Sequence, residues 1–108
     1  MRLRKKKNLE ERILQCGDIL AVYEQYDFYS LSEDKKYNII DTQKVFGNNN
    51  PVYLEVGCGK GGFVCEMASK HPEINFLAVE KISNVLICAM EKAIALGLKN
   101  VVFLNCDA

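Results

Sequence analysis

The chain has 108 residues, of which 49% are hydrophobic and 26% are charged, and its formal net charge at pH 7 is zero. This length allows one compact domain with a modest core, and no apolar run approaches the roughly 20 residues that a membrane-spanning helix needs. The charged first seven residues are not followed by a hydrophobic stretch, which argues against a secretory signal, so we expect a cytoplasmic protein with no membrane partner.

The first twelve residues form a cationic arm. Six basic and two acidic side chains give this arm a charge of +4 and leave −4 on the rest of the chain. Such an arm either contacts phosphates in a salt-dependent manner or is a solvated terminus, and composition alone leaves both interpretations open. The candidate phosphate contacts are Arg2, Arg4, Lys5, Lys6 and Lys7.

Hydrophobic residues recur at three-to-four spacing from Leu9 to about Tyr26, which predicts a helix that Gly17 weakens in the middle. From Asp27 to Asn50 no period persists. Ser30-Leu31-Ser32-Glu33 has the form of a capping box, and Asn48-Asn49-Asn50-Pro51 is a strong turn signal. We therefore expect residues 1–50 to form a basic arm and a helical lead-in.

The hydrophobic period changes after Pro51. Short apolar runs predict strands at 52–56, 74–79 and 101–106, and amphipathic stretches predict helices at 61–70 and 83–96. The first strand is expected to be buried, and Phe63 is expected in the core. Strands that alternate with helices predict a Rossmann-like, doubly wound α/β fold with a parallel sheet. Because the sequence ends directly after the third strand, we expect residues 51–108 to be the first half of this domain, with an unpaired edge on the first strand.

Acidic residues stand near the ends of the three predicted strands. These residues are Glu55, Glu80 and Asp107. Ligands of open parallel sheets bind beyond the carboxyl ends of the strands, so we expect the three carboxylates to face one crevice.

A glycine-rich turn joins the first strand to the first helix. Gly57, Gly59 and Gly61 permit a tight turn with close backbone approach to a ligand. The spacing Gly57-x-Gly59-x-x-Gly62 also matches the dinucleotide fingerprint, so the glycines alone leave both NAD and an adenosyl cofactor open. Glu55 favours the adenosyl cofactor, because a carboxylate beside the turn repels a diphosphate and attracts the sulfonium and ammonium groups of S-adenosylmethionine.

Further positions fit an adenosyl ligand. Glu80 can accept hydrogen bonds from both ribose hydroxyls, as it would also from those of NAD. Asp107 can accept one from the adenine amino group while the Ala108 N–H reaches a ring nitrogen, or it can be a polar strand terminus or helix cap. The candidate cofactor-binding residues are Glu55, Gly57, Gly59, Gly61, Glu80, Asp107 and Ala108.

The five cysteines and the single histidine are interpreted as structural residues. No Cys-x-x-Cys pair occurs and His71 alone cannot complete a zinc cluster, so we expect no metal site. An odd number of cysteines in apolar patterns is typical of buried, reduced thiols, so no disulfide is expected. Cys58 and Cys65 fit as small fillers rather than nucleophiles, and His71 precedes Pro72 in a surface turn.

Three stretches occur in order along the chain: Met1-Arg2-Leu3-Arg4, Val45-Phe46-Gly47-Asn48-Asn49-Asn50-Pro51 and Leu54-Glu55-Val56-Gly57-Cys58-Gly59-Lys60-Gly61-Gly62-Phe63. Together they resemble the bacterial tRNA (guanine-N(7)-)-methyltransferase family. The likeness continues through Met67-Ala68, residues 72–76, Glu80 and residues 100–108, whereas residues 10–44 match less clearly.

The resemblance implies a class I methyltransferase fold that binds S-adenosylmethionine through Glu55, Glu80 and Asp107. It implies methyl transfer to the 7-nitrogen of a guanosine in the variable loop of tRNA, and it gives the basic arm a partner. In the family a later carboxylate lies in a segment containing Asp-Pro-Trp-Pro. This sequence has no such segment and no Trp, so no catalytic residue is identified and we expect these 108 residues alone to be inactive.

Two other interpretations stay open. In the first, the methyltransferase fold is kept but the substrate is a small molecule or a protein. In the second, the chain is a non-catalytic RNA-binding fragment that acts through its basic arm.

Overall fold

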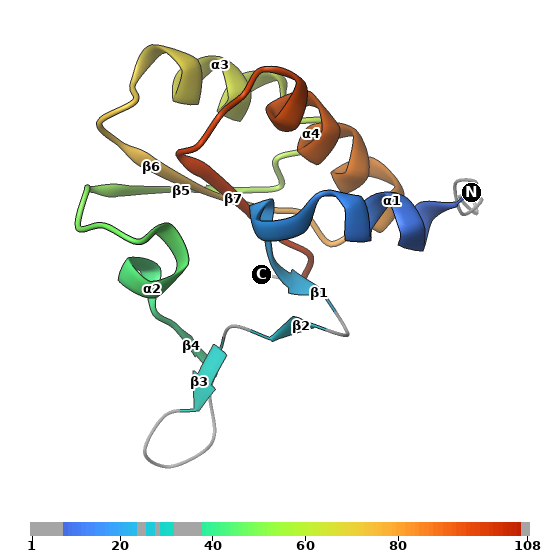
Figure 1. The fold of residues 1–108 in the computed structure, drawn as a ribbon, viewed down its shortest axis with the longest axis horizontal. Coiled ribbons are helices and arrows are strands. Elements are labelled where there is room, and N and C mark those ends of the chain that lie inside the picture. The colour runs from blue at the N-terminus through green and yellow to red at the C-terminus, as the bar shows by residue number, and fades with distance from the viewer. Residues whose placement is uncertain (1–7, 24–25, 28, 32–37, 107–108) are drawn as a thin grey trace.

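The computed structural model describes residues 8–23, 26–27, 29–31 and 38–106 of the chain. Its main feature is a five-stranded sheet with the strand order β2-β1-β7-β6-β5, and β3 and β4 form a separate two-stranded sheet (Figure 1). None of the helices in this described part is both long and apolar enough to cross a bilayer.

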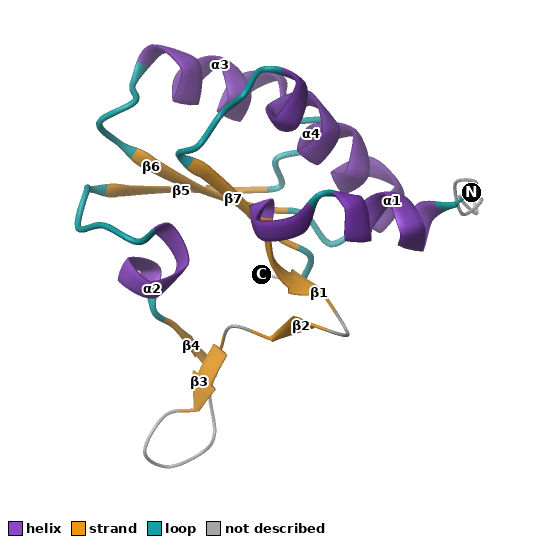
Figure 2. Ribbon diagram, viewed as in Figure 1, coloured by secondary structure: helices purple, strands orange, loops and turns teal. Residues whose placement is uncertain are grey.

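Three neighbouring strands of the large sheet are the parallel strands that the sequence predicted. β5 (Val52–Val56), β6 (Asn75–Val79) and β7 (Val101–Leu104) pair in parallel. The connections between them are the helices α3 (Gly62–Lys70) and α4 (Ser83–Ala95) (Figure 2). The predicted α/β fold with a parallel sheet is therefore confirmed.

The helices cover both faces of this sheet. α1 (Leu9–Gln15), α3 and α4 lie on one face, whereas α2 (Thr42–Phe46) lies on the other (Figure 1). Successive side chains of a strand point to opposite faces, so β6 and β7 supply both clusters. The first cluster packs the three helices against Phe76, Ala78, Val101 and Phe103, and the second packs α2 against Leu77, Val79, Val102 and Leu104.

The helix predicted from Leu9 to Tyr26 is wrong beyond its first half. α1 ends at Gln15, a 3-10 turn spans Gly17–Ile19, and Leu20–Tyr23 is strand β1. Gly17 has a φ of +58°, a left-handed conformation that ends helices and suits glycine. β1 then pairs in parallel with β7 and antiparallel with β2 (Tyr26–Asp27). Sheet pairing thus outweighs the helical spacing of the side chains.

The capping box predicted at residues 30–33 is also wrong where the structure describes it. Ser30 lies inside strand β3 (Tyr29–Leu31), which pairs antiparallel with β4 (Asn38–Ile40). Ser32 and Glu33 lie outside the described residues.

Helix α2 was not predicted, although its ends carry ordinary capping signals. The Asp41 carboxylate accepts a hydrogen bond from the Lys44 N–H at 3.2 Å, and Gly47 follows the helix with a φ of +74°. The turn after it is the predicted one: the Asn48 side-chain oxygen accepts from the Asn50 N–H at 3.0 Å and from the Asn75 amide at 2.8 Å.

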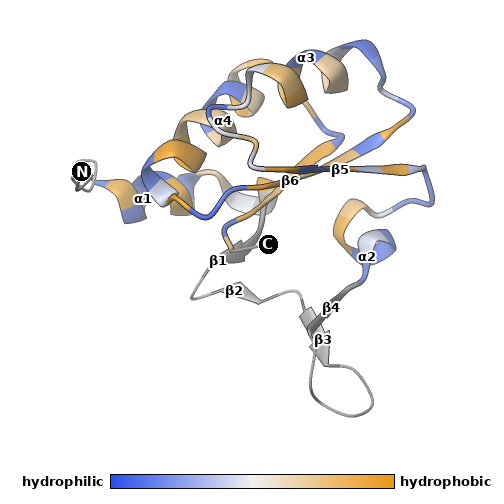
Figure 3. Cartoon of the chain, turned by 180° about the vertical axis from the view of Figure 1, so that it is seen from behind, coloured by the Kyte–Doolittle hydropathy of each residue, from blue (hydrophilic) through white to orange (hydrophobic). Residues whose placement is uncertain are grey.

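Strand β5 is more exposed than predicted. Its side chains Tyr53, Leu54 and Val56 are 62%, 57% and 59% exposed, because β5 is the edge strand of the described sheet and pairs only with β6. Figure 3 shows both hydrophobic and hydrophilic colouring along this strand. Phe63, expected in the core, is 62% exposed, because α3 turns Val64 and Cys65 inward instead.

Candidate functional site

The candidate site is the turn between β5 and α3. Gly57, Gly59 and Gly61 have φ values of +76°, +57° and +83°, which L side chains rarely adopt. A Cβ added at Gly57 or Gly59 would meet no atom of the described residues within 4 Å. The first two glycines therefore leave open space beside the turn, whereas Gly61 lies against α4.

The amide groups of the turn point mostly into the protein. The N–H groups of Gly57 and Cys58 donate to the Val79 carbonyl at 2.7 and 2.9 Å, and the Gly61 N–H donates to the Cys58 carbonyl at 3.0 Å. A loop that cradles a diphosphate aims such donors at the ligand. This turn instead uses them to fix itself to the end of β6.

Glu80 follows β6 and contacts the same turn. One carboxylate oxygen accepts from the Gly59 N–H at 3.2 Å, and the other accepts from the Ile82 N–H at 3.1 Å. The residue is half-buried, so its carboxylate lies between the glycine turn and the start of α4. Glu80 therefore lies against the turn, whereas the predicted crevice of three carboxylates stays a prediction, because Asp107 lies outside the described residues.

Glu55 lies under the turn rather than in open solvent. In the parallel register Tyr53 and Glu55 stand opposite Phe76 and Ala78, which belong to the cluster on the α3 and α4 side. The ring centroids of Tyr53 and Phe76 are 6.0 Å apart, which agrees with the two side chains lying on the same face of the sheet. The Oε2 atom of Glu55 is buried and has no hydrogen-bond partner among the described residues. Burial raises the pKa of this carboxyl above its ordinary value.

This burial gives the free energy of unfolding a defined pH dependence. Because the pKa of Glu55 is higher in the folded than in the unfolded chain, the folded state binds more protons, and stability falls as pH rises from about 4.5 through the folded pKa. Urea unfolding of wild type and Glu55→Gln at a series of pH values measures this. We expect the free energy of unfolding of the variant to increase relative to that of wild type as pH rises through this range. Parallel pH curves for the two proteins would contradict the assignment.

Cys58 lies inside the turn and is a packing residue. Burial, followed by the nearby Glu80 and Glu55 carboxylates, raises the pKa of its thiol to about 12. Since the thiolate is the reactive form, we expect Cys58 to resist iodoacetamide at pH 8 in the folded protein and to react readily in urea. Peptide mass mapping after alkylation measures this, and labelling of Cys58 at the same rate in both states would refute it.

The remaining predicted positions are placed as follows. Asp107, Ala108 and the arm residues Arg2, Arg4, Lys5, Lys6 and Lys7 lie outside the described residues. All five cysteines are free thiols. Within the described ranges no three side chains of His, Cys, Asp or Glu gather as metal ligands. His71 ends α3 at the surface, where its Nδ1 lies 3.3 Å from a Glu73 carboxylate oxygen.

One residue of the site was not predicted from the sequence. Asn105 follows β7, and its side chain contacts the segment that carries Glu80. The only sequence signal is a polar amide directly after a buried strand, which is also typical of an ordinary turn.

The chain is similar in sequence to a family of known proteins. A family described as "Putative methyltransferase" matches residues 49–108. The tRNA (guanine-N(7)-)-methyltransferase of Geobacillus kaustophilus is 37% identical over 108 residues, which cover 100% of this chain and 45% of that protein. The protein of the same name from Listeria welshimeri is 47% identical over 66 residues, or 61% of this chain and 31% of the relative. The chain thus spans less than half the length of these curated relatives.

A solved structure is also similar. It is described as "Structure of an antibiotic related Methyltransferase" and superposes with a TM-score of 0.53 at 22% identity, over 71% of this chain and 37% of that one. At this identity the likeness supports the fold, and it agrees with the parallel sheet and flanking helices seen here.

Proposed function

This chain belongs to the family of putative methyltransferases, and from that premise we propose that it is the S-adenosylmethionine-binding part of a tRNA (guanine-N(7)-)-methyltransferase. The name of the Geobacillus relative, which matches along the whole chain, supports the choice of substrate. The observation that carries the choice of cofactor is the buried, unpartnered Oε2 atom of Glu55 beneath the glycine turn.

The residues of the turn fit this cofactor better than a dinucleotide. Three N–H groups of the turn donate to backbone carbonyls of the protein and one donates to Glu80, so they are not aimed outward as a diphosphate cradle. Two carboxylates beside the turn, Glu55 and Glu80, favour a cationic ligand over an anionic one. Glu55 would hold the charged amino-acid end, and Glu80 would accept hydrogen bonds from the ribose hydroxyls. Asp107 and the Ala108 N–H would bind adenine.

The reaction needs no general base. The bound cofactor supplies a methyl group on a positively charged sulfur, and the 7-nitrogen of neutral guanine carries a lone pair and no proton. Transfer of this methyl group to the nitrogen would leave a neutral thioether and a cationic purine, so no proton would have to be removed. This chain's residues bind and orient the cofactor, so that the rate gain comes from alignment of the two reacting atoms.

The basic arm is the proposed tRNA contact of this chain. Lys and Arg side chains that neutralise phosphates make binding strongly salt-dependent. The proposed substrate is a tRNA guanosine in the variable loop, and on the same ground we propose that the protein is cytoplasmic. The arm residues concerned are Arg2, Arg4, Lys5, Lys6 and Lys7.

A methyl-transfer assay tests the proposal. The full-length protein is incubated with unmodified tRNA and labelled S-adenosylmethionine. The tRNA is then digested, and the labelled nucleosides are identified. We expect 7-methylguanosine in the variable loop. Methylation of a small molecule or protein but not of tRNA would favour the rival substrate class, and S-adenosylmethionine binding without any transfer would favour a binding module.

A further inference from the structure

A hydrogen-bonded clamp holds the segment that follows β6. The side-chain amide of Asn105 donates to the backbone carbonyls of Glu80 at 3.1 Å and of Lys81 at 3.3 Å. Its side-chain oxygen accepts from the Ser83 hydroxyl at 2.9 Å. One side chain after β7 therefore uses its amide and its oxygen to bind three of the four residues from Glu80 to Ser83, which join β6 to α4.

The clamp acts on the backbone that carries Glu80. The Glu80 N–H donates to the Leu104 carbonyl at 3.0 Å, and the Glu80 carbonyl accepts from the Asn105 side chain. Both backbone polar groups of Glu80 are therefore held by hydrogen bonds. The carboxylate of the same residue then bridges the Gly59 and Ile82 N–H groups. The direction of this carboxylate depends on the backbone of residues 80–82. The clamp holds that backbone through the carbonyls of Glu80 and Lys81.

We infer that Asn105 is a positioning residue of the cofactor site, which acts by holding the Glu80 carboxylate in the direction that the ribose hydroxyls require. This inference rests on the proposed function, because it takes the ligand to be an adenosyl cofactor. Asn105 itself need not touch the ligand. Side chains that orient a binding group through hydrogen bonds, without contacting the ligand, are a general means of fixing a site.

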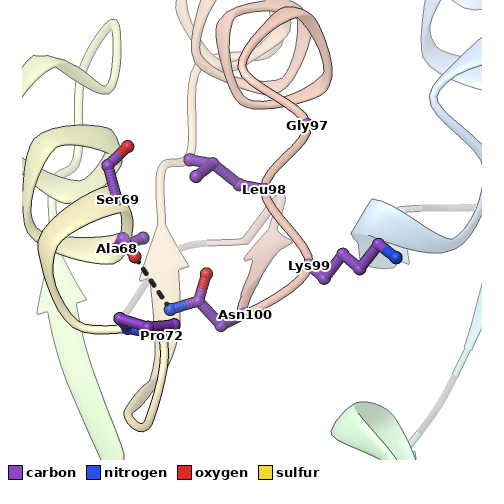
Figure 4. Close-up of a pocket in the computed structure, with 7 residues that line it drawn as sticks. All are labelled: Ala68, Ser69, Pro72, Gly97, Leu98, Lys99 and Asn100. Atoms are coloured by element: carbon purple, nitrogen blue, oxygen red, sulfur yellow. Dashed lines mark hydrogen bonds between the residues drawn. The ribbon is translucent and has the colours of Figure 1, made fainter.

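The chain offers a matched control in Asn100, which makes the same kind of contacts at the other end of the sheet. Its side-chain amide lies within hydrogen-bond distance of the Ala68, His71 and Ile74 carbonyls, at 3.1, 2.9 and 2.9 Å. Figure 4 shows Asn100 with Ala68 and Pro72 beside a surface pocket. This pocket lies where β6 and β7 begin, so Asn100 supports the fold without reaching Glu80.

The test is a double-mutant cycle on the affinity for S-adenosylhomocysteine, measured by calorimetry with the full-length protein. We expect Asn105→Ala to weaken binding on the order of tenfold. Without the Asn105 amide the Glu80 and Lys81 carbonyls lose a hydrogen-bond donor, and the Glu80 carboxylate can turn away from the ligand. In a Glu80→Ala background the same substitution should change affinity less than twofold, because the group that it positions is gone. Ser83→Ala, a milder change, should show a smaller loss in the same direction.

Stability and exchange measurements separate positioning from folding. Asn100→Ala should lower the melting temperature while leaving the affinity within twofold of wild type. Asn105→Ala should speed hydrogen exchange at the Gly59 and Ile82 amides, which the Glu80 carboxylate protects.

An equal loss from Asn105→Ala with and without Glu80, or none at all, would overturn the inference and leave the proposed function standing. Wild-type protein that binds no S-adenosylhomocysteine would overturn both.

Discussion

Gly61→Ala should lower the free energy of unfolding by about 2–5 kcal/mol. Gly61 has a φ of +83°, and a Cβ there would lie 2.7 Å from the Ala89 Cβ and 3.0 Å from the Ala89 Cα. The left-handed backbone costs about 1–2 kcal/mol for a residue with a side chain, and overpacking a core adds about 1–3 kcal/mol. Because α3 and α4 meet at this contact, the substitution must push the two helices apart. Urea unfolding monitored by circular dichroism measures the loss.

Gly62→Ala is the matched control, one residue further along. Gly62 is the first residue of α3, and a Cβ there would meet no atom of the described residues within 4 Å. Alanine has a higher helix propensity than glycine, so this variant should be as stable as wild type or slightly more stable. Equal stability of the two variants would show that α3 and α4 are not in close contact at Gly61.

Glu55→Gln should weaken the binding of S-adenosylmethionine by roughly tenfold to a hundredfold without lowering the stability of the protein. A carboxylate about 4 Å from a cationic group gains on the order of 4 kcal/mol gross at an effective dielectric of ~20, of which a smaller part survives desolvation. One oxygen of this carboxylate, Oε2, is buried without a hydrogen-bond partner among the described residues, so the neutral replacement removes a partly buried charge that is unfavourable without the ligand. Calorimetric titration and urea unfolding of the same preparations measure the two effects.

A neutral ligand is the control for this prediction. 5′-Methylthioadenosine keeps the nucleoside and the sulfur but lacks both the positive charge on sulfur and the amino-acid ammonium. Its affinity should change less than threefold on Glu55→Gln, because the lost interaction is with charge. Equal weakening of both ligands would mean that the substitution distorts the turn rather than removing an electrostatic contact.

The second half of the fold was predictable because its signals are local and agree with one another. Apolar runs such as 52–56 and 74–79 alternate with amphipathic helices, and Gly97 follows α4 with the φ of +67° expected of a glycine at a helix end. The first half was less predictable because its structure depends on distant partners. Leu20–Tyr23 keeps a helical spacing, yet it becomes a strand because β7 offers a free edge eighty residues later.

The site also has a part that the sequence predicts and a part that depends on distant contacts. The glycine turn and its two carboxylates are predictable from the sequence, because residues 55–61 and Glu80 directly follow or end apolar runs that predict strands. The direction of Glu55 was not predictable, because it follows from the register in which Glu55 stands opposite Ala78. The role of Asn105 was hidden for a similar reason, since its contacts join segments that are 22 to 25 residues apart.

We propose that the carboxylates beside the glycine turn select a cationic adenosyl cofactor. Competitive calorimetry of the full-length protein with S-adenosylmethionine and with NAD tests it most directly. We expect S-adenosylmethionine to bind and NAD not to displace it. Tighter binding of NAD, with a diphosphate held at the turn, would contradict it.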